Sequence, residues 1–182
     1  MEPEETVYLD ALEALVADHR IQLARIADLL DRMSPQQYRS EQAPNASVGA
    51  HVRHVLEHYD QLLDDDEGMV DYDRRPREKR LESCPRTAAS RIHLIATALT
   101  ELSNVPVRVR HRPEFGPEDY FFDIDSTIER ELAFLLSHTI HHMAMMAQRA
   151  CQSGVEAPAS FGVMPSTLRY WQTLDTESSN RS

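Results

Sequence analysis

Apolar residues recur at helical spacing in several separate segments of this chain. In the segment 6–33 they are three or four residues apart, with charged residues between them, as in a helix that buries one face. A similar pattern fills the segment 47–65, where Ser47 is a suitable N-cap. A third begins at Pro85, a residue that favours the first turn of a helix. These patterns predict three long helices.

A fourth and longest helix is predicted near the end of the chain. The sequence Ser126-Thr-Ile-Glu129 has the Ser-x-x-Glu form of a capping box and precedes an unbroken helical pattern. The pattern continues through Cys151, and Gly154 is suited to the position just after a helix end. Four long helices without an internal repeat predict an all-α protein built as a four-helix bundle.

The remaining segments predict shorter or irregular structure. Residues 66–84 are charged and show no periodicity, so we expect a long loop. The alternating run 105–111 and the aromatic-rich run 120–124 can pair as a hairpin, in which Pro106 would confine the first strand to an edge.

The end of the chain is predicted to contain a short helix and a disordered tail. A short helix capped at Ser166 is expected in the tail, followed by disorder over 177–182. We therefore expect a single domain over residues 1–175 and a disordered tail over 176–182.

Composition narrows the classes of function. The chain has 182 residues and a net charge of −11, and such a surface repels nucleic acid. No apolar run is long enough to span a membrane, and the acidic N-terminus does not resemble a signal peptide. Cys84 and Cys151 are far apart and form no metal-binding spacing. We expect a soluble cytoplasmic protein with neither a nucleic-acid nor a membrane partner.

Histidines are the residues that point to chemistry. Six of the nine lie in two clusters, one on the second predicted helix and one on the fourth. These are His51, His54 and His58, and His138, His141 and His142. His138 and His142 are four residues apart, so both rings can face one metal ion. At 100° per residue this pair lies at the edge of the apolar stripe of its helix.

The same angular count does not decide which histidine of the second predicted helix would be the ligand. His54 lies at the edge of its apolar stripe, His51 lies nearer the centre, and His58 is four residues from His54. Periodicity therefore predicts a metal where two helices meet, but it leaves three candidates on one of them. The remaining histidines, His19, His93 and His111, are interpreted as packing or surface residues.

The two clusters together resemble a known family. Ser47-Val-Gly-Ala-His-Val-Arg-His54 and His138-Thr-Ile-His-His142 are similar to the motifs of the DinB/YfiT-like metalloenzymes, across nearly the whole chain in helix order and length. This resemblance selects His54, His138 and His142 as metal ligands.

It further implies an up-down-down-up four-helix bundle, often dimeric, that holds zinc, nickel or iron. Relatives include S-transferases and isomerases that use low-molecular-weight thiols, so the resemblance implies a small-molecule substrate of that kind. Related iron-dependent sulfoxide synthases carry HxxxHxE on the last helix, whereas this chain has Ala144 in place of that glutamate. An oxygen-using reaction is therefore disfavoured.

Other residues are candidates for the surroundings of the metal. His51, His58 and His141 are candidates for pocket lining or for orienting a ligand, and Glu131 is either an orienting carboxylate or a helix-capping charge. Tyr72, Arg74 and Arg77 would hold a substrate carboxylate if their loop folds over the metal.

Two functions remain at this point. The first is a metal-dependent enzyme, since three neutral ligands leave a coordination position open. The second is a non-catalytic metal-binding or small-molecule-binding protein of a stress response.

Overall fold

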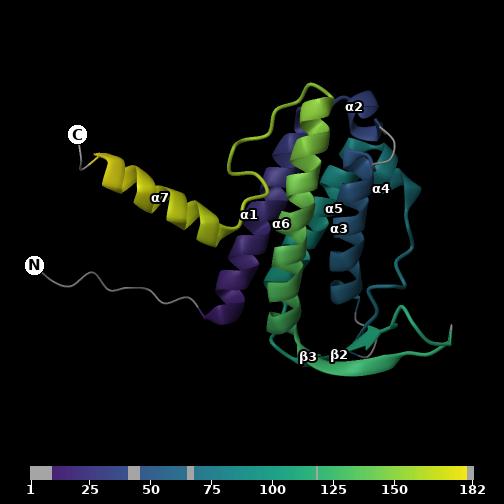
Figure 1. Ribbon diagram of the computed structural model, residues 1–182. Helices are drawn as coiled ribbons and strands as arrows, with labels where there is room; N and C mark the ends of the chain where they lie inside the picture. The colour runs from purple at the N-terminus through teal and green to yellow at the C-terminus, as the bar shows by residue number, and fades with distance from the viewer. Residues whose placement is uncertain (1–9, 41–45, 65–67, 118, 180–182) are drawn as a thin grey trace, which may run out of the picture.

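Four long helices form the core of the protein in the computed structural model, which describes residues 10–40, 46–64, 68–117 and 119–179 (Figure 1). They are α1 (Ala11–Asp31), α3 (Val48–Leu63), α5 (Pro85–Ala98) and α6 (Ile128–Gln152). Helices α1 and α3 each pack against both α5 and α6. The prediction of an all-α protein is confirmed in part, because the described chain is mainly helical but also contains a small three-stranded sheet. The start of the first helix was expected at Thr6, which lies outside the described residues.

The helices are held together by a core of aliphatic side chains. Leu23, Ile26, Leu56, Leu132 and Leu135 have no exposed surface, and they come from α1, α3 and α6. Burial of each such side chain stabilises the fold by roughly 1.5–3 kcal/mol relative to its exposure. The apolar stripes found in the sequence therefore face one another.

The helix starts agree with the sequence at one site and differ at another. The Ser47 side chain accepts a hydrogen bond from the backbone N–H of Ala50 at 3.0 Å, as expected of the N-cap of α3. The N-cap of α6 is Thr127, so the predicted capping box at Ser126 is wrong. Ser126 is part of a β-strand, and its hydroxyl donates to Glu131 at 2.6 Å instead.

The charged segment predicted as a loop, which the structure describes over residues 68–84, has more regular secondary structure than expected. It contains the short strand β1 (Met69–Val70) and the helix α4 (Lys79–Ser83), where a single loop was expected. Two further short helices, α2 (Pro35–Arg39) and the 3₁₀ helix η1 (Leu99–Glu101), complete the connections among the long ones. The residues between β1 and α4 remain without regular structure.

The predicted hairpin is present, but its position in the sheet differs. Strands β2 (Pro106–His111) and β3 (Phe122–Thr127) pair antiparallel, and β1 pairs with β2 in parallel. The order is β1-β2-β3, so β2 is central and its prediction as an edge strand is wrong. Pro106 is tolerated because β1 pairs only with Arg108 and Val109.

The chain after α6 turns back and ends in another helix. Gly154 adopts a φ of +79° just after α6, as expected for a residue following a helix end. Gly162, at φ +73°, lies so close to the α6 backbone that a Cβ there would be 2.3 Å from the nitrogen of Ala144. Helix α7 (Pro165–Ser179) then points away from the four long helices (Figure 1).

Helix α7 is longer than the sequence indicated. It continues through Ser179, into the segment 176–182 that was predicted to be disordered, and residues 180–182 lie outside the described part. Among the described helices, none is long and apolar enough to cross a membrane.

A buried polar chain links three of the long helices. His19 on α1 has no exposed surface, and its Nδ1 is 2.6 Å from the hydroxyl of Tyr59 on α3. Its Nε2 is 2.9 Å from the carbonyl of Leu132, which can only accept, so Nε2 donates and Nδ1 accepts from Tyr59. The Tyr59 oxygen in turn accepts from Thr139 on α6 at 3.0 Å. His19 is therefore a core residue, as interpreted from the sequence, and is held as a neutral tautomer.

This arrangement predicts a loss of stability in mild acid. Burial lowers the pKa of His19 from 6.5 to about 4. Below pH 6.5 the unfolded chain binds a proton that the folded chain does not, so the free energy of unfolding falls as the pH drops from 6.5 towards 4. The His19 contribution to this loss is at most about 3 kcal/mol. Urea unfolding of metal-free protein at several pH values measures it.

The matched variant is His19→Gln, whose amide can donate to Leu132 and accept from Tyr59 without titrating. We expect this variant to lose less stability than the wild type between pH 7 and pH 5. Parallel stability curves for the two proteins would rule out His19 as the titrating group.

Candidate metal centre

Three imidazole rings converge where α3 packs against α6. His54 comes from α3, and His138 and His142 come from successive turns of α6. One nitrogen of each ring lies within 4.8 Å of the corresponding nitrogen of the other two. The Nε2 atoms of His54 and His138 are 3.1 Å apart. The spacing of four residues on α6 therefore brings both of its rings to the same point as His54.

The register between the two helices is set by the buried polar chain. Tyr59 directly follows His58, and Thr139 directly follows His138, and the hydrogen bond between them crosses from α3 to α6. A sliding movement of either helix would break this bond and separate the histidines. Core packing and the position of the three rings are thus coupled.

The rings of this cluster are neutral at physiological pH. All three are at least partly buried, and this burial lowers the pKa of His54 to about 2 and that of His142 to about 3. The neighbouring imidazoles contribute further to both shifts. Burial also lowers the pKa of His138. A neutral ring has one nitrogen with a free lone pair, which is the form that binds metal.

The geometry fits a divalent metal ion. Nitrogen ligands bind zinc at about 2.0–2.1 Å, so two of them on one tetrahedral ion lie about 3.3 Å apart. The 3.1 Å between His54 and His138 agrees with this separation. Imidazole suits zinc, nickel, copper and iron alike, so the donor set leaves the identity of the metal open.

His51 and His58, the two alternatives on α3, both belong to the surroundings of the cluster. His51 Nδ1 is 3.2 Å from Nδ1 of His142, so it can fix the orientation of that ring. His58 Nδ1 donates to the backbone carbonyl of His54 at 2.6 Å. The remaining nitrogen of His58, Nε2, is 3.2 Å from the guanidinium NH1 of Arg75. His141 is exposed, and its ring contacts that of His142.

Aromatic side chains and the loop after β1 cover one side of the cluster. Tyr72 stacks on His58 with ring centroids 5.4 Å apart, and Phe134 stacks on His138 at 5.7 Å. The Tyr72 and Phe134 rings also contact each other. The loop therefore folds over the histidines. This is the condition under which Tyr72, Arg74 and Arg77 were predicted to hold a substrate.

Glu131 holds this loop in place. Its carboxylate is 2% exposed and accepts hydrogen bonds from Tyr72 at 2.9 Å and Ser126 at 2.6 Å. Arg130 also pairs with it at 3.2 Å. Within the described chain Glu131 makes no hydrogen bond to a histidine. Glu131 therefore holds Tyr72 by a hydrogen bond, a role that was not predicted from the sequence.

The arginine beside the cluster differs from the two selected in the sequence. Arg74 lines a separate polar cavity of about 290 Å³ together with Asp64, Asp71 and Arg110. Arg77 is exposed. Arg75, lying between them in the chain, reaches His58. A loop without periodicity gives no signal for choosing among its arginines, whereas Phe134, four residues before His138, could have been found by helical spacing.

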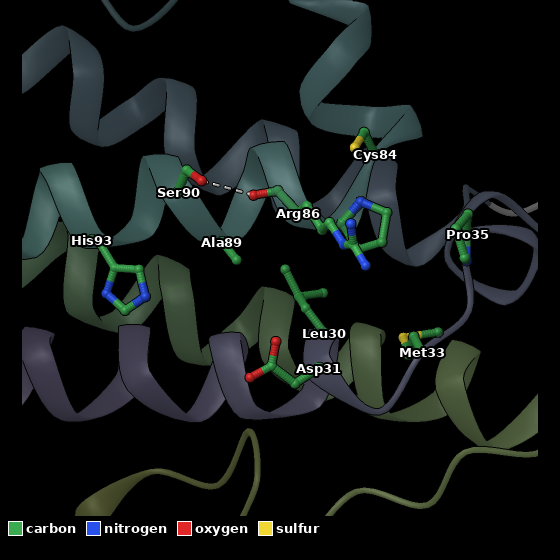
Figure 2. Close-up of a pocket in the computed structure, with 10 residues that line it drawn as sticks. Leu30, Asp31, Met33, Pro35, Cys84, Arg86, Ala89, Ser90 and His93 are labelled. Carbon is green, nitrogen blue, oxygen red and sulfur yellow. Dashed lines mark hydrogen bonds between the residues drawn. The ribbon is translucent and has the colours of Figure 1, made fainter.

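The other reactive residues lie elsewhere. Cys84 and His93 line a cavity of about 770 Å³ beside α1 and α5, together with Leu30, Met33 and Arg86 (Figure 2). None of the three clustered histidines lines this cavity. The thiols of Cys84 and Cys151 are both free.

Comparisons with known proteins give a partial relative and a family. FK506-binding protein 5 of Rhizopus delemar is 28% identical over 105 residues, or 56% of this chain. The match spans only 27% of that longer protein. No solved structure matches the chain significantly. The model of the DinB superfamily matches residues 19–146, a range that contains all three histidines, and the chain belongs to this superfamily.

Proposed function

We propose that His54, His138 and His142 bind one divalent metal ion, which is zinc, nickel or iron. The observation that carries this proposal is the convergence of three neutral imidazole nitrogens within 4.8 Å. Buried imidazoles need partners, and one ion can serve all three. Membership in the DinB superfamily supports the same ligand set.

We further propose that the protein is a thiol-dependent enzyme, an S-transferase or isomerase acting on a small molecule. A bound divalent ion supplies a Lewis acid that lowers the pKa of a coordinated thiol. Three neutral ligands leave the charge of the ion uncompensated, which favours an anionic sulfur. Tyr72 and Phe134 place aromatic rings against His58 and His138, and Ala144 stands where the oxygen-using relatives have a carboxylate.

The alternative is a non-catalytic metal-binding or small-molecule-binding protein of a stress response. The loop over the histidines favours it, because a site closed on one side is less open to substrates. Binding of a thiol to the metal separates the two functions, since catalysis of the proposed kind requires that position.

The proposed assembly follows the superfamily. We propose that α1, α3, α5 and α6 are an up-down-down-up four-helix bundle within one domain over residues 1–175, which can form a homodimer. A cytoplasmic location remains a prediction from the sequence.

The ligand assignment predicts a graded response to histidine substitution. His54→Ala, His138→Ala and His142→Ala each remove a ligand and should lower metal affinity by more than about 10-fold. His51→Ala removes only the partner of His142 and should lower affinity less. His141→Ala, exposed on the same helix, is the matched control and should retain the metal. Elemental analysis of each variant, purified without an affinity tag, measures its metal content. Equal loss from all variants, or loss from His141→Ala alone, contradicts the assignment.

The proposed thiol chemistry predicts a spectroscopic signature. Cobalt-substituted protein titrated with cellular thiols should develop a sulfur-to-cobalt charge-transfer band, because an anionic sulfur takes the open position. Turnover of a thiol with a reactive electrophile should depend on the metal and be lost in His142→Ala. Metal binding without sulfur ligation by any thiol would instead favour the non-catalytic alternative.

A further inference from the structure

A half-buried arginine, Arg75, lies close to the proposed metal ligands, with the ring of His58 between them. Arg75 NH1 contacts Nε2 of His58, and the His58 ring is 4.4 Å, centroid to centroid, from each of the rings of His54 and His138. Among the arginines of the described loop between β1 and α4, Arg75 is the one hydrogen-bonded to His58, the ring beside the cluster. Its guanidinium thus has a defined position beside the metal site.

Only one edge of this guanidinium is used by the protein. NH1 donates to the backbone carbonyl of Tyr72 and to His58. The Nε atom is shielded from solvent and has no acceptor, and NH2 makes no hydrogen bond within the described chain. A shielded donor without an acceptor is destabilising, so this nitrogen favours a ligand that can accept from it. The edge formed by Nε and NH2 is the fork that binds a carboxylate through two parallel hydrogen bonds.

The charge of Arg75 is also uncompensated at short range. Within the described residues no carboxylate lies within 4.0 Å of it, whereas Arg91, Arg110 and Arg112 each form such an ion pair. Glu57 and Asp73 attract Arg75 from farther away, and the Oε1 of Glu57 accepts from the backbone N–H of Glu78 at 2.6 Å.

Metal loading makes this imbalance larger. A divalent ion held by three neutral imidazoles would place a second positive centre near Arg75, and the two repel each other. An anionic group lying between them would be attracted to both. The arrangement is therefore suited to a ligand that brings its own negative charge.

From this geometry we propose that Arg75 binds the carboxylate of a small ligand whose sulfur reaches the metal. The substrate class is then a low-molecular-weight thiol that carries a carboxylate. This inference rests on the proposed metal site and deepens it. Arg75 acts as a substrate-binding residue that determines specificity, in the place that the sequence analysis assigned to Arg74 and Arg77.

Two thiols that differ only in charge test this inference. Cobalt-loaded protein is titrated with 3-mercaptopropionate and with 3-mercaptopropionamide, and the charge-transfer band reports the affinity of each. The carboxylate should bind at least ~10-fold more tightly than the amide to the wild type. In Arg75→Gln the ratio of the two affinities should fall to about one. Arg75→Lys keeps the charge but not the fork, and should give an intermediate ratio.

Arg74→Gln is the matched control, because Arg74 lies in the same loop but lines a different cavity. Arg74→Gln should keep the wild-type ratio of affinities for the two thiols. Metal content and thermal stability are measured for every variant, so that a loosened loop is recognised. An equal affinity for the two thiols in the wild type, or an equal effect of Arg74→Gln and Arg75→Gln, would overturn the role of Arg75.

A second measurement is independent of thiol chemistry. In zinc-loaded protein, propionate should shift the NMR resonance of the Arg75 Nε–H, which is assigned by its absence from Arg75→Gln. A shift without any sulfur ligation in the cobalt protein would support Arg75 as a carboxylate site and contradict the proposed thiol function. Sulfur ligation without a shift, and without a preference for the carboxylate, would leave the proposed function standing and refute the inference.

Discussion

The contact between α3 and α6 is the interaction on which the candidate site depends. Each helix carries polar residues at the edge of an apolar stripe, and close packing of the stripes removes these polar groups from water. Tyr59 and Thr139 satisfy each other across the contact, and His54 and His138 approach to 3.1 Å immediately beside them. Because a misplaced polar group would be left without a partner, the packing of the core also sets the geometry of the histidines.

Neutrality of the imidazoles follows from the same contact. Burial lowers the pKa of His19, His54 and His142, so these rings keep a lone pair available well below neutral pH. His19 uses its lone pair to accept from Tyr59, and the rings of His54, His138 and His142 can present theirs to an ion. The fold therefore accommodates a metal-binding cluster without placing positive charges in its interior.

The loop after β1 adds the electrostatic part of the site. Glu131 fixes Tyr72, and Tyr72 accepts through its carbonyl from Arg75, so a buried carboxylate on α6 determines where a guanidinium lies. This sequence of contacts links β3, α6 and the loop through Ser126. The helices supply the histidines, and this loop supplies a positive charge, Arg75, beside them.

Periodicity along the chain was sufficient to predict the long helices, the Ser47 cap and the shared face of His138 and His142 on α6, because each depends on residues close in sequence. The same local reasoning failed where a distant partner decides the outcome. Ser126 pairs in the sheet with Val107 instead of capping α6, and β2 is central because β1, which was predicted as loop, joins its other side.

For the site itself, sequence determined which helix faces carry histidines and, through resemblance to a family, which three to select. Tertiary structure decided the roles of His51 and His58 and moved the cationic contact from Arg74 and Arg77 to Arg75. The physical reason is that helical spacing specifies an azimuth on one helix, whereas a contact between helices or with a loop depends on register and burial. These are set only when the whole core has packed.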